Sequence, residues 1–259
     1  MPSIQVDTSI CNKDGLCVRV CPTNNITLGE DGFPVSMDNC ISCGQCQAVC
    51  PTDAVTLHGV APQALELSDP KSVGFDALAK VIKSRRSIRE FKDDPIPPQQ
   101  LKKLMEVVRF APTGGNRQSV EWVFVEKKET MKEVLRLAAE WARGSKDLSF
   151  LATAYDKGQD RILRGAPHLA IAHTGSTYGS ARLDSAIAAT TLELLAHTSG
   201  IGTCWAGFFL TAMADHANPL YGLLGIPSDH QVGAALMMGF PRLRYRRVPQ
   251  RKPIQMKSV

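Results

Sequence analysis

The chain has 259 residues, a formal net charge of +5 and a hydrophobic content of 44%. This length fits one large core, or a small module of about sixty residues joined to a domain of about two hundred. The start, MPSIQVDTSI, lacks the basic and apolar runs of a signal peptide, and no segment approaches the ~20 apolar residues of a membrane helix. We therefore expect a cytoplasmic protein that binds no membrane.

Cysteines and charge divide the chain into two unequal parts. Seven of the eight cysteines lie within residues 11–50. Residues 1–60 contain six acidic and two basic side chains, a formal charge of −4, so the rest of the chain carries +9. We expect a small cysteine-rich domain at 1–60, a linker at 61–73 and a larger, basic domain at 74–259.

The first of two cysteine runs, ICNKDGLCVRVCP at residues 10–22, has an aspartate, Asp14, where a fourth cysteine would complete its spacing. The second run, NCISCGQCQAVCP at 39–51, has the full CxxCxxCxxxCP spacing of bacterial ferredoxins. A reducing cytosol disfavours a disulfide framework. A zinc site usually has two separated CxxC pairs, or one pair with histidines. Iron–sulfur ligation is therefore the prediction.

Each run is followed by a β-like stretch, NNITL at 24–28 and DAVTL at 53–57, so the segment repeats internally and resembles a two-cluster ferredoxin. The resemblance implies one 4Fe-4S cluster on Cys21, Cys40, Cys43 and Cys46. It implies a second cluster on Cys11, Cys17 and Cys50, with its fourth corner facing Asp14.

Asp14 leaves the nature of the second cluster open. A carboxylate is a harder and weaker iron ligand than a thiolate, which predicts a labile corner and either a 4Fe-4S or a 3Fe-4S cluster. In the alternative interpretation, Asp14 and Gly15 only shape a turn over a three-iron site.

Beyond the linker, hydrophobic periodicity predicts both helices and strands. The helices are expected at 75–82, at 101–108, near 131–142 and at 180–200, where Gly200 can end the last one. The strands are expected at 120–126, 165–174, 202–209 and 231–239. Because no regular βαβ repeat is present, we expect an α+β layer rather than a Rossmann domain.

Basic residues concentrate in two places. Arg85, Arg86, Ser87 and Arg89 could clamp a phosphate through paired guanidinium bonds, although alone they could also form a solvated helix end. The segment RLRYRRVPQRK at 242–252 adds six basic residues and no acid. No RNA- or DNA-binding signature accompanies these residues, so we expect no nucleic-acid partner.

Four segments, in order and separation, resemble the motifs of the nitroreductase superfamily, which are dimeric FMN-dependent reductases. They are RRSIREF at 85–91, APTGGNRQS at 111–119, GIGTCWAGF at 200–208 and VPQRKP at 248–253. The resemblance covers residues 74–254 and implies an α+β fold with a mixed sheet and surrounding helices.

The resemblance also implies an FMN site shared between the two chains of a homodimer. Arg85, Arg86 and Ser87 would bind the phosphate and ribityl chain, and Arg89 would reach the pyrimidine edge, where a cation stabilises reduced flavin. The partner subunit would supply the residues of the second motif, Pro112, Thr113, Gly114 and Asn116. Backbone near flavin N5 would come from Trp205, Ala206 and Gly207, and further phosphate contacts from Arg251 and Lys252.

The chain departs from the common family pattern in two places, both of which concern the substrate more than the flavin. Ser119 and Val120 stand where proline and tryptophan are frequent, and CWAGFF has no acidic residue near N5. No side chain stands out as a catalytic acid or nucleophile. The remaining candidates are interpreted as core or helix-face residues rather than ligands: Cys204, His168, His173, His197, Met237 and Met238.

A ferredoxin module joined to a flavin domain suggests conversion of one-electron into two-electron transfer. The donor would be a ferredoxin, a flavodoxin or NAD(P)H, and the acceptor a nitroaromatic, a quinone or a similar electrophile. The alternative is a relay or redox sensor with no small substrate. It would be favoured if Trp205, Phe208 or Phe209 plugged the flavin face.

Overall fold

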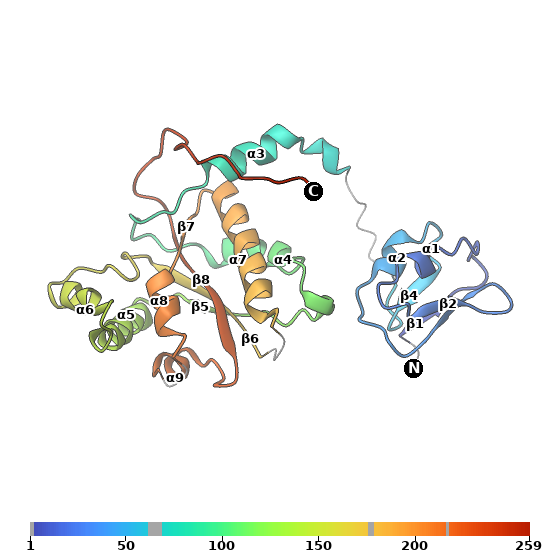
Figure 1. The fold of residues 1–259 in the computed structure, drawn as a ribbon, viewed down its shortest axis with the longest axis horizontal. Helices are drawn as coiled ribbons and strands as arrows, with labels where there is room; N and C mark the ends of the chain where they lie inside the picture. Colours follow the sequence, from blue (N-terminus) through green and yellow to red (C-terminus); the bar gives the residue numbers. More distant parts are fainter. Residues whose placement is uncertain (1–2, 62–68, 176–178, 216–217) are drawn as a thin grey trace. The chain divides into compact units, whose positions relative to one another are not determined.

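The structure is a computed structural model that describes residues 3–61, 69–175, 179–215 and 218–259 (Figure 1). The chain divides into two compact units. The first comprises residues 1–72 with 114–117, and the second comprises 73–113 with 118–259. Among the described residues, no helix is long and apolar enough to cross a membrane.

The first unit contains two small antiparallel ladders and two short helices. Strand β1 (Ile4–Val6) pairs with β4 (Val55–Leu57), and β2 (Ile26–Leu28) pairs with β3 (Pro34–Ser36). The helices are α1 (Leu16–Arg19) and α2 (Gln45–Val49), and a 3-10 turn, η1, covers Pro70–Ser72. The predicted internal repeat is visible, since α1 leads to β2 and α2 leads to β4.

The two halves of the repeat have the same backbone conformation just before their helices. Gly15 and Gly44 precede α1 and α2 with φ of 68° and 73°, in the left-handed region that glycine adopts without strain. Asp14 and Cys43 therefore occupy equivalent positions. The core of the unit is small and consists of Ile4, Cys17, Ile26, Cys46 and Val55. Domains with so little core usually need cross-links or metals for stability.

The second unit is built on a four-stranded antiparallel sheet in the order β5-β6-β8-β7. The strands are β5 (Glu121–Val125), β6 (His168–Thr174), β7 (Gly202–Trp205) and β8 (Gln231–Gly239). Ser87 adds a single parallel bridge to Thr203, at the free edge of β7. The central strands β6 and β8 are apolar and largely buried, as expected for strands covered on both faces.

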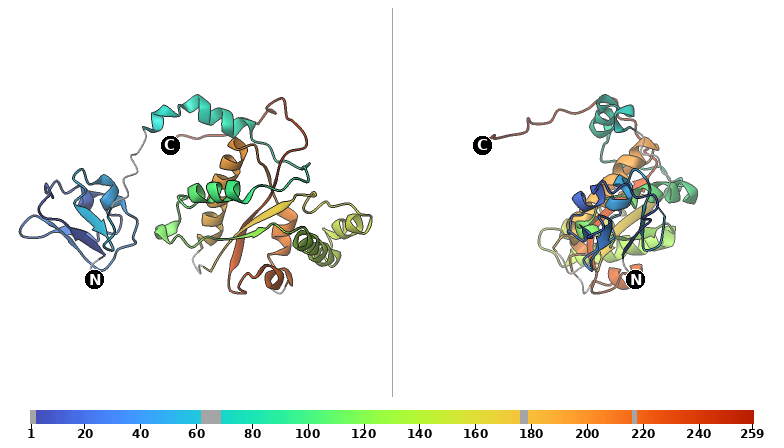
Figure 2. Two further views of the ribbon diagram at one scale, coloured as in Figure 1. Left: turned by 180° about the vertical axis from the view of Figure 1, so that it is seen from behind. Right: turned by 90° about the vertical axis from the view of Figure 1, so that its right-hand side faces the viewer.

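Helices surround this sheet (Figures 1 and 2). They are α3 (Phe75–Ser84), α4 (Pro98–Val108), α5 (Lys128–Arg143), α6 (Ser149–Asp156), α7 (Ala181–Thr198), α8 (Gly207–Ala212) and α9 (Leu220–Leu224). Gly200 follows α7 with φ of 75°, which confirms its predicted role in ending that helix. The 3-10 turn η2 covers Gly114–Asn116.

Alternation along the central strands separates two cores. Leu169 and Ile171 of β6 pack with α5, α6, α8 and α9, whereas Ala170 and Ala172 pack with α4 and α7. Successive side chains of a strand point to opposite faces, so one strand serves both cores. The unit is thus a helix–sheet–helix sandwich, which confirms the predicted α+β class. The expected mixed sheet is not found, because the four strands pair antiparallel throughout and the parallel pairing is limited to the Ser87 bridge.

Three predicted strands are shorter than expected: β5 at both ends, β6 at its start and, most of all, β7. The segment at 202–209 was expected to be extended throughout, but β7 ends at Trp205 and α8 begins at Gly207. Ala206 donates its N–H to the carbonyl of Ala235 and closes the ladder there. Periodicity cannot separate short apolar strands from short buried helices, and for this reason α6, α8 and α9 were not predicted.

Candidate functional site

A basic cavity of about 440 Å³ lies in the second unit, beside the C-terminal end of α3 and the N-terminal end of β7. Its charged lining residues are Arg85, Arg86, Lys92, Arg242 and Arg244. Among the described residues that line it, no side chain is acidic. A concave surface with charge of one sign concentrates ligands of the opposite charge, so the cavity fits an anion.

Backbone pairing brings these residues together from segments far apart in the sequence. Ile88 donates its N–H to the carbonyl of Thr203 (2.8 Å), and Lys92 donates to that of Phe240 (2.8 Å). Phe91 also forms an antiparallel bridge with the residue after Phe240. The segment after α3 is thereby fixed against β7 and against the chain that leaves β8, where Arg242 and Arg244 lie.

Arg85 is oriented by a buried acid, Glu193 on α7. The Arg85 Nη1 and Glu193 Oε1 atoms are 3.2 Å apart, and the Glu193 side chain is only 8% exposed. The same carboxylate oxygen accepts a hydrogen bond from Thr203 Oγ1 (3.3 Å). Glu193 thus holds the guanidinium group at the cavity wall. The signal in the sequence was an acid within a largely apolar helix, a feature that Glu193 shares with Asp184, and the role of Glu193 was not predicted.

The other side chains at this end of α3 are also engaged. Arg86 donates hydrogen bonds to the carbonyls of Ser84 (3.3 Å) and Lys83 (2.6 Å), so it caps the last turn of the helix. The His197 Nε2 and Ser84 Oγ atoms are 2.8 Å apart. Burial, and then the positive charges of Arg85 and Arg86, lower the pKa of His197, so this imidazole contributes hydrogen bonding rather than charge.

The remaining residues of the first and third motifs follow around β7. Ser87 bridges Thr203, and Arg89 lies close enough to Cys204 to influence its thiol. Burial raises the pKa of the Cys204 thiol, while the positive charge of Arg89 opposes that rise. Cys204 is buried, as predicted, and its raised pKa disfavours the reactive thiolate.

The end of β7 is tightly packed. Ala206 is fully buried, and Trp205 packs against the core that contains α4 and α7. Gly207 opens α8 with no atom within 4 Å of the Cβ that it lacks. These three residues lie in sequence at one corner of the sheet, beside the bridge to Ser87.

Of the predicted flavin residues, Arg85 and Arg86 line this cavity, whereas Ser87, Arg89 and the three residues at the end of β7 are not among its lining residues. The remaining predicted residues lie elsewhere within the chain. Thr113 lines a separate hollow of about 170 Å³, and its Oγ1 accepts the N–H of Gln118 (2.9 Å). Pro112 is exposed, and η2, with Gly114 and Asn116, groups with the first unit. Arg251 and Lys252 are exposed in the C-terminal tail. In their place the cavity contains Arg242 and Arg244, which the sequence marked only as part of a basic tail.

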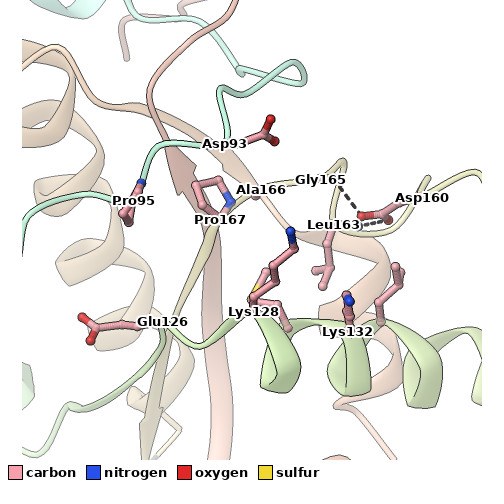
Figure 3. A pocket seen from close by; sticks show the side chains of 12 residues that line it. Asp93, Pro95, Glu126, Lys128, Lys132, Asp160, Leu163, Gly165, Ala166 and Pro167 are labelled. Carbon is pink, nitrogen blue, oxygen red and sulfur yellow. Dashed lines mark hydrogen bonds between the residues drawn. The ribbon is translucent and has the colours of Figure 1, made fainter.

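A second, larger hollow of about 520 Å³ lies against α5 (Figure 3). Its charges are mixed, because Asp93, Glu126 and Asp160 accompany Lys128 and Lys132. Asp160 is committed to a turn, where its carboxylate accepts the N–H groups of the loop before β6 (Figure 3). The hollow therefore lacks the charge of one sign that marks the basic cavity.

In the first unit, four cysteines surround one small cavity of about 20 Å³. They are Cys21, Cys40, Cys43 and Cys46, the set that the resemblance to ferredoxins assigns to one cluster. Asn25 donates its N–H to Cys21 Sγ (3.2 Å), and Ser42 donates to Cys40 Sγ (3.4 Å). Backbone N–H groups directed at sulfur stabilise thiolates, so the donor set fits an iron–sulfur cluster.

Three members of the second predicted set, Cys11, Asp14 and Cys17, are also close together. Burial raises the pKa of the Cys17 thiol, and the nearby charges of Asp14 and Cys11 raise it further. Asp14 is exposed, and its Oδ1 accepts the N–H of Leu16 (2.9 Å) at the start of α1. One carboxylate oxygen therefore shapes the turn while the residue stays beside Cys11 and Cys17. Asp14 has a structural role whether or not it binds iron.

Comparison with known proteins agrees with this division. The profile of the nitroreductase family matches residues 82–240, and that of the 4Fe-4S dicluster domain matches residues 4–54. The chain belongs to the nitroreductase family. It is therefore an oxidoreductase, as the four motifs predict, and it carries a 4Fe-4S dicluster domain at its N-terminal end.

Individual relatives resemble mainly the second unit. The FMN reductase (NAD(P)H) of Bacillus subtilis is 28% identical over 179 residues, which are 68% of this chain and 70% of the relative. A nitroreductase structure with bound FMN from Desulfitobacterium hafniense matches 70% of this chain and 98% of its own, with a TM-score of 0.60 and 28% identity. One from Bacteroides fragilis has the same TM-score and coverage at 22% identity, and supports the fold.

Proposed function

We propose that this protein is an FMN-dependent oxidoreductase whose basic cavity binds the flavin phosphate. Electrons would come from the N-terminal iron–sulfur domain or from NAD(P)H, and would pass to a nitroaromatic, a quinone or a similar electrophile. The observation that supports this most directly is the cavity itself, where Arg85, Arg86, Arg242 and Arg244 line a space free of acidic lining residues among those described.

The relatives support FMN as the anion that binds in the basic cavity. The similar structure from Desulfitobacterium hafniense contains FMN, and the similar Bacillus subtilis protein is an FMN reductase. A phosphate dianion suits guanidinium groups that donate paired hydrogen bonds. Arg85, held in place by Glu193, is the principal candidate for the phosphate, with Arg86 and Ser87 beside it. Arg251 and Lys252, in the basic tail that follows Arg244, would add further contacts to the phosphate.

When bound, FMN supplies the chemistry of accepting single electrons and delivering a hydride. The chain's own residues bind it and adjust its surroundings. Arg89 supplies a fixed positive charge near β7, where it favours an anion at the flavin edge. Trp205, Ala206 and Gly207 provide the backbone corner beside it. Phe209 is fully buried in the core and Phe208 packs edge-to-face against Phe150, which favours an accessible flavin face over a plugged one.

The N-terminal domain, proposed at residues 1–60, would hold two clusters. The cavity lined by Cys21, Cys40, Cys43 and Cys46 supports a 4Fe-4S cluster there. The second would be a 4Fe-4S or 3Fe-4S cluster on Cys11, Cys17 and Cys50, with Asp14 at its fourth corner. We also propose a cytoplasmic setting, where a reducing environment disfavours disulfides and leaves the cysteines available as cluster ligands.

A homodimer is part of the proposal. Residues 61–73 would link the iron–sulfur domain to the flavin domain at 74–259, and the partner would contribute the 112–116 loop. Large apolar side chains on two helices support such an interface: Phe75, Leu78 and Ile82 on α3 are 83%, 51% and 52% exposed. On α7, Leu183 and Ile187 are 64% and 41% exposed. Exposed apolar surface of this kind often marks a protein interface.

Anaerobic turnover of the holoprotein tests the function. Reduced ferredoxin, reduced flavodoxin and NADPH would be compared as donors, with a nitroarene and a quinone as acceptors. Turnover of at least one acceptor with at least one donor is the expected result. If the flavin is reduced and reoxidised only by protein partners, the electron-relay function is correct and the proposal of a small-molecule reductase is wrong.

A further inference from the structure

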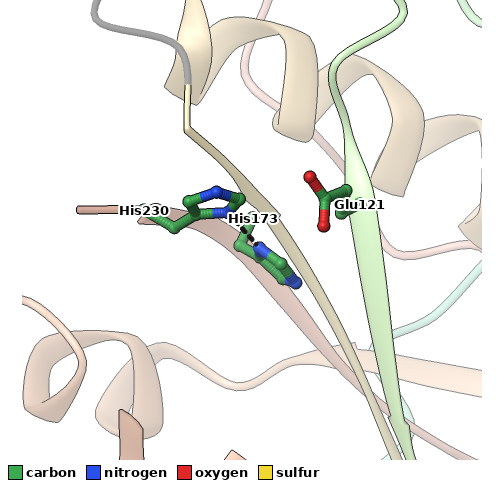
Figure 4. Close-up of side chains that lie close together, drawn as sticks. All are labelled: Glu121, His173 and His230. Atoms are coloured by element: carbon green, nitrogen blue, oxygen red, sulfur yellow. Dashed lines mark hydrogen bonds between the residues drawn. The ribbon is translucent and has the colours of Figure 1, made fainter. Parts of the chain in front are cut away.

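Three side chains with metal-binding atoms meet at one end of the sheet in the second unit. They are Glu121, the first residue of β5, His173 on β6 and His230, which directly precedes β8 (Figure 4). Their candidate ligand atoms all lie within 4.8 Å of one another. None of the three belongs to the basic cavity or to the cysteine sets.

The pairing of the strands explains why these three side chains lie close together. Glu121 lies directly opposite His173 in the β5–β6 ladder, and opposed residues share one face of a sheet. The β6–β8 register shifts between Ala172 and His173. Such irregularities redirect side chains and often accompany functional sites. The outcome is a distance of 2.8 Å between the Nδ1 atoms of His173 and His230.

Each of the two imidazoles can offer a ring nitrogen to a metal ion. His173 is only 4% exposed, so its ring is held within the sheet beside His230. Without an ion, one Nδ1 of the pair must carry a proton and the other must accept it. Glu121 is exposed and adds an anionic oxygen donor. Gly175 leaves room for the His230 ring, since a Cβ there would lie 2.6 Å from His230 Nε2.

We propose that Glu121, His173 and His230 bind a divalent transition-metal ion, with a water molecule in the remaining position. Imidazole nitrogens suit zinc, nickel and copper, and a carboxylate completes a three-ligand set like those that leave one position open. Ligand atoms about 2.0–2.1 Å from a tetrahedral ion lie roughly 3.3 Å apart. The histidine pair therefore opens slightly and the carboxylate moves inward, which side-chain rotation at the half-buried His230 and the exposed Glu121 allows.

Nickel is the probe, because it accepts imidazole ligands and is less drawn to thiolates than zinc is. Untagged, full-length holoprotein is dialysed to equilibrium against Ni²⁺ near neutral pH, and bound nickel is measured by elemental analysis. One high-affinity Ni²⁺ per chain is expected. His230→Ala should lose it, and Glu121→Gln should weaken it at least about tenfold, since even outer-shell partners contribute that much.

His58→Asn is the matched control. His58 is an exposed histidine in the first unit, and its φ of 49° is one that asparagine also tolerates. This variant should bind nickel as the wild type does. Because His173 is buried and its replacement could unfold the protein, the test relies on the more exposed Glu121 and His230.

Thermal unfolding distinguishes one nickel site formed by these three residues from nonspecific nickel binding at the surface. Ni²⁺ should raise the Tm of the wild type and of His58→Asn, but not that of His230→Ala, because only a ligand that binds the folded state stabilises it. If wild type binds no nickel, or if His230→Ala binds it with unchanged affinity and an equal rise in Tm, the proposal is wrong. The three residues would then form only a hydrogen-bonded histidine pair beside a carboxylate.

Discussion

Glu193 and Arg85 form a half-buried ion pair that leaves part of the Arg85 guanidinium group available to a ligand in the cavity. Glu193 is almost fully buried, whereas the Arg85 side chain is 23% exposed toward the basic cavity. A buried carboxylate requires a partner, and the guanidinium group has further donors that Glu193 does not use. The pair therefore holds one side of the Arg85 fork in place and leaves the other side for an anion.

Replacing Arg85 with alanine should weaken FMN binding by about ten- to a hundredfold. The reason is the loss of charge-assisted hydrogen bonds, worth roughly 1.5–3 kcal/mol. The measurement is flavin retained after exhaustive dialysis, followed by titration of the apoprotein with FMN. Arg136→Ala is the control, because Arg136 is an exposed arginine on α5 that pairs with Glu133 one turn away. Equal flavin affinity in wild type and Arg85→Ala would show that the phosphate binds elsewhere.

Asp14 determines how firmly one corner of the second proposed cluster is held. If its carboxylate closes the cluster on Cys11, Cys17 and Cys50, that corner should lose iron on oxidation, because oxygen holds iron less firmly than sulfur does. Air-exposed protein should then show a three-iron signal by electron paramagnetic resonance. Adding ferrous iron and dithionite should convert this three-iron cluster into a four-iron cluster. Asp14→Cys should abolish the conversion and lower the reduction potential of the cluster.

The hydrogen bond from Leu16 to Asp14 suggests the control for this experiment. Asp14→Asn keeps an oxygen that can accept the Leu16 N–H but removes the anionic ligand. It should leave the turn intact and make the corner at least as labile. If wild type holds two equally robust four-iron clusters and Asp14→Cys changes neither, then Asp14 serves only as a turn residue.

At the scale of elements, the close approach of α7 to β8 depends on one glycine. A Cβ at Gly233 would lie 2.5 Å from the Cβ of Ser185 and 3.2 Å from the Cα of Arg182, both on α7. Backbone cannot move as a long side chain can, so the helix would have to shift. The small residues Ala188, Ala189 and Ala234 form the core along the same contact.

Gly233→Ala should therefore destabilise the second unit by about 1–3 kcal/mol, the usual cost of overpacking. Thermal unfolding of the holoprotein should show a lower Tm, by roughly 2–4 °C for each kcal/mol. Gly222→Ala on α9 is the matched control, because a Cβ there meets no atom within 4 Å and alanine favours helix. A Tm for Gly233→Ala that equals the wild-type value would mean that α7 moves away at no cost.

The helices and strands of the second unit show which parts of the fold could be predicted from the sequence. Long amphipathic patterns predicted α3, α4 and α7, and apolar runs predicted β6 and β8, because these patterns reflect burial over several turns or along a whole strand. The division between β7 and α8 was not predictable, since it depends on the pairing of Ala206 with Ala235 across the sheet. Contacts between distant segments have no local pattern.

The candidate sites follow the same rule. Arg85, Arg86 and the cysteine runs were predicted because each motif is contiguous in the sequence. Glu193, and the position of Arg242 in the cavity, were not, because pairing of strands and helices brings them there. His173 was expected to be buried and is, but its contact with His230 arises from the register shift in the β6–β8 ladder.

At the scale of the molecule, the apolar stripe of α3 is unusual. The spacing of Phe75, Leu78 and Ile82 predicts a helix, and the helix forms, but no residue of α3 is buried. Burial of a helix stripe is normally the main source of its stability. The stripe therefore needs a partner surface, and α7 presents a second apolar row of the same kind.

The whole-molecule prediction is that the holoprotein sediments as a dimer and that Leu183→Glu shifts it toward the monomer. Leu183 is 64% exposed on α7, so glutamate there costs the folded monomer little, yet it would bury a charge in the proposed interface. Val35→Glu, at a 49% exposed strand position of the first unit, is the control and should remain dimeric. Flavin should be lost from Leu183→Glu along with the dimer, because the proposed site takes its 112–116 loop from the partner. A stable monomer that retains FMN would contradict the shared site even if the basic cavity binds the phosphate as proposed.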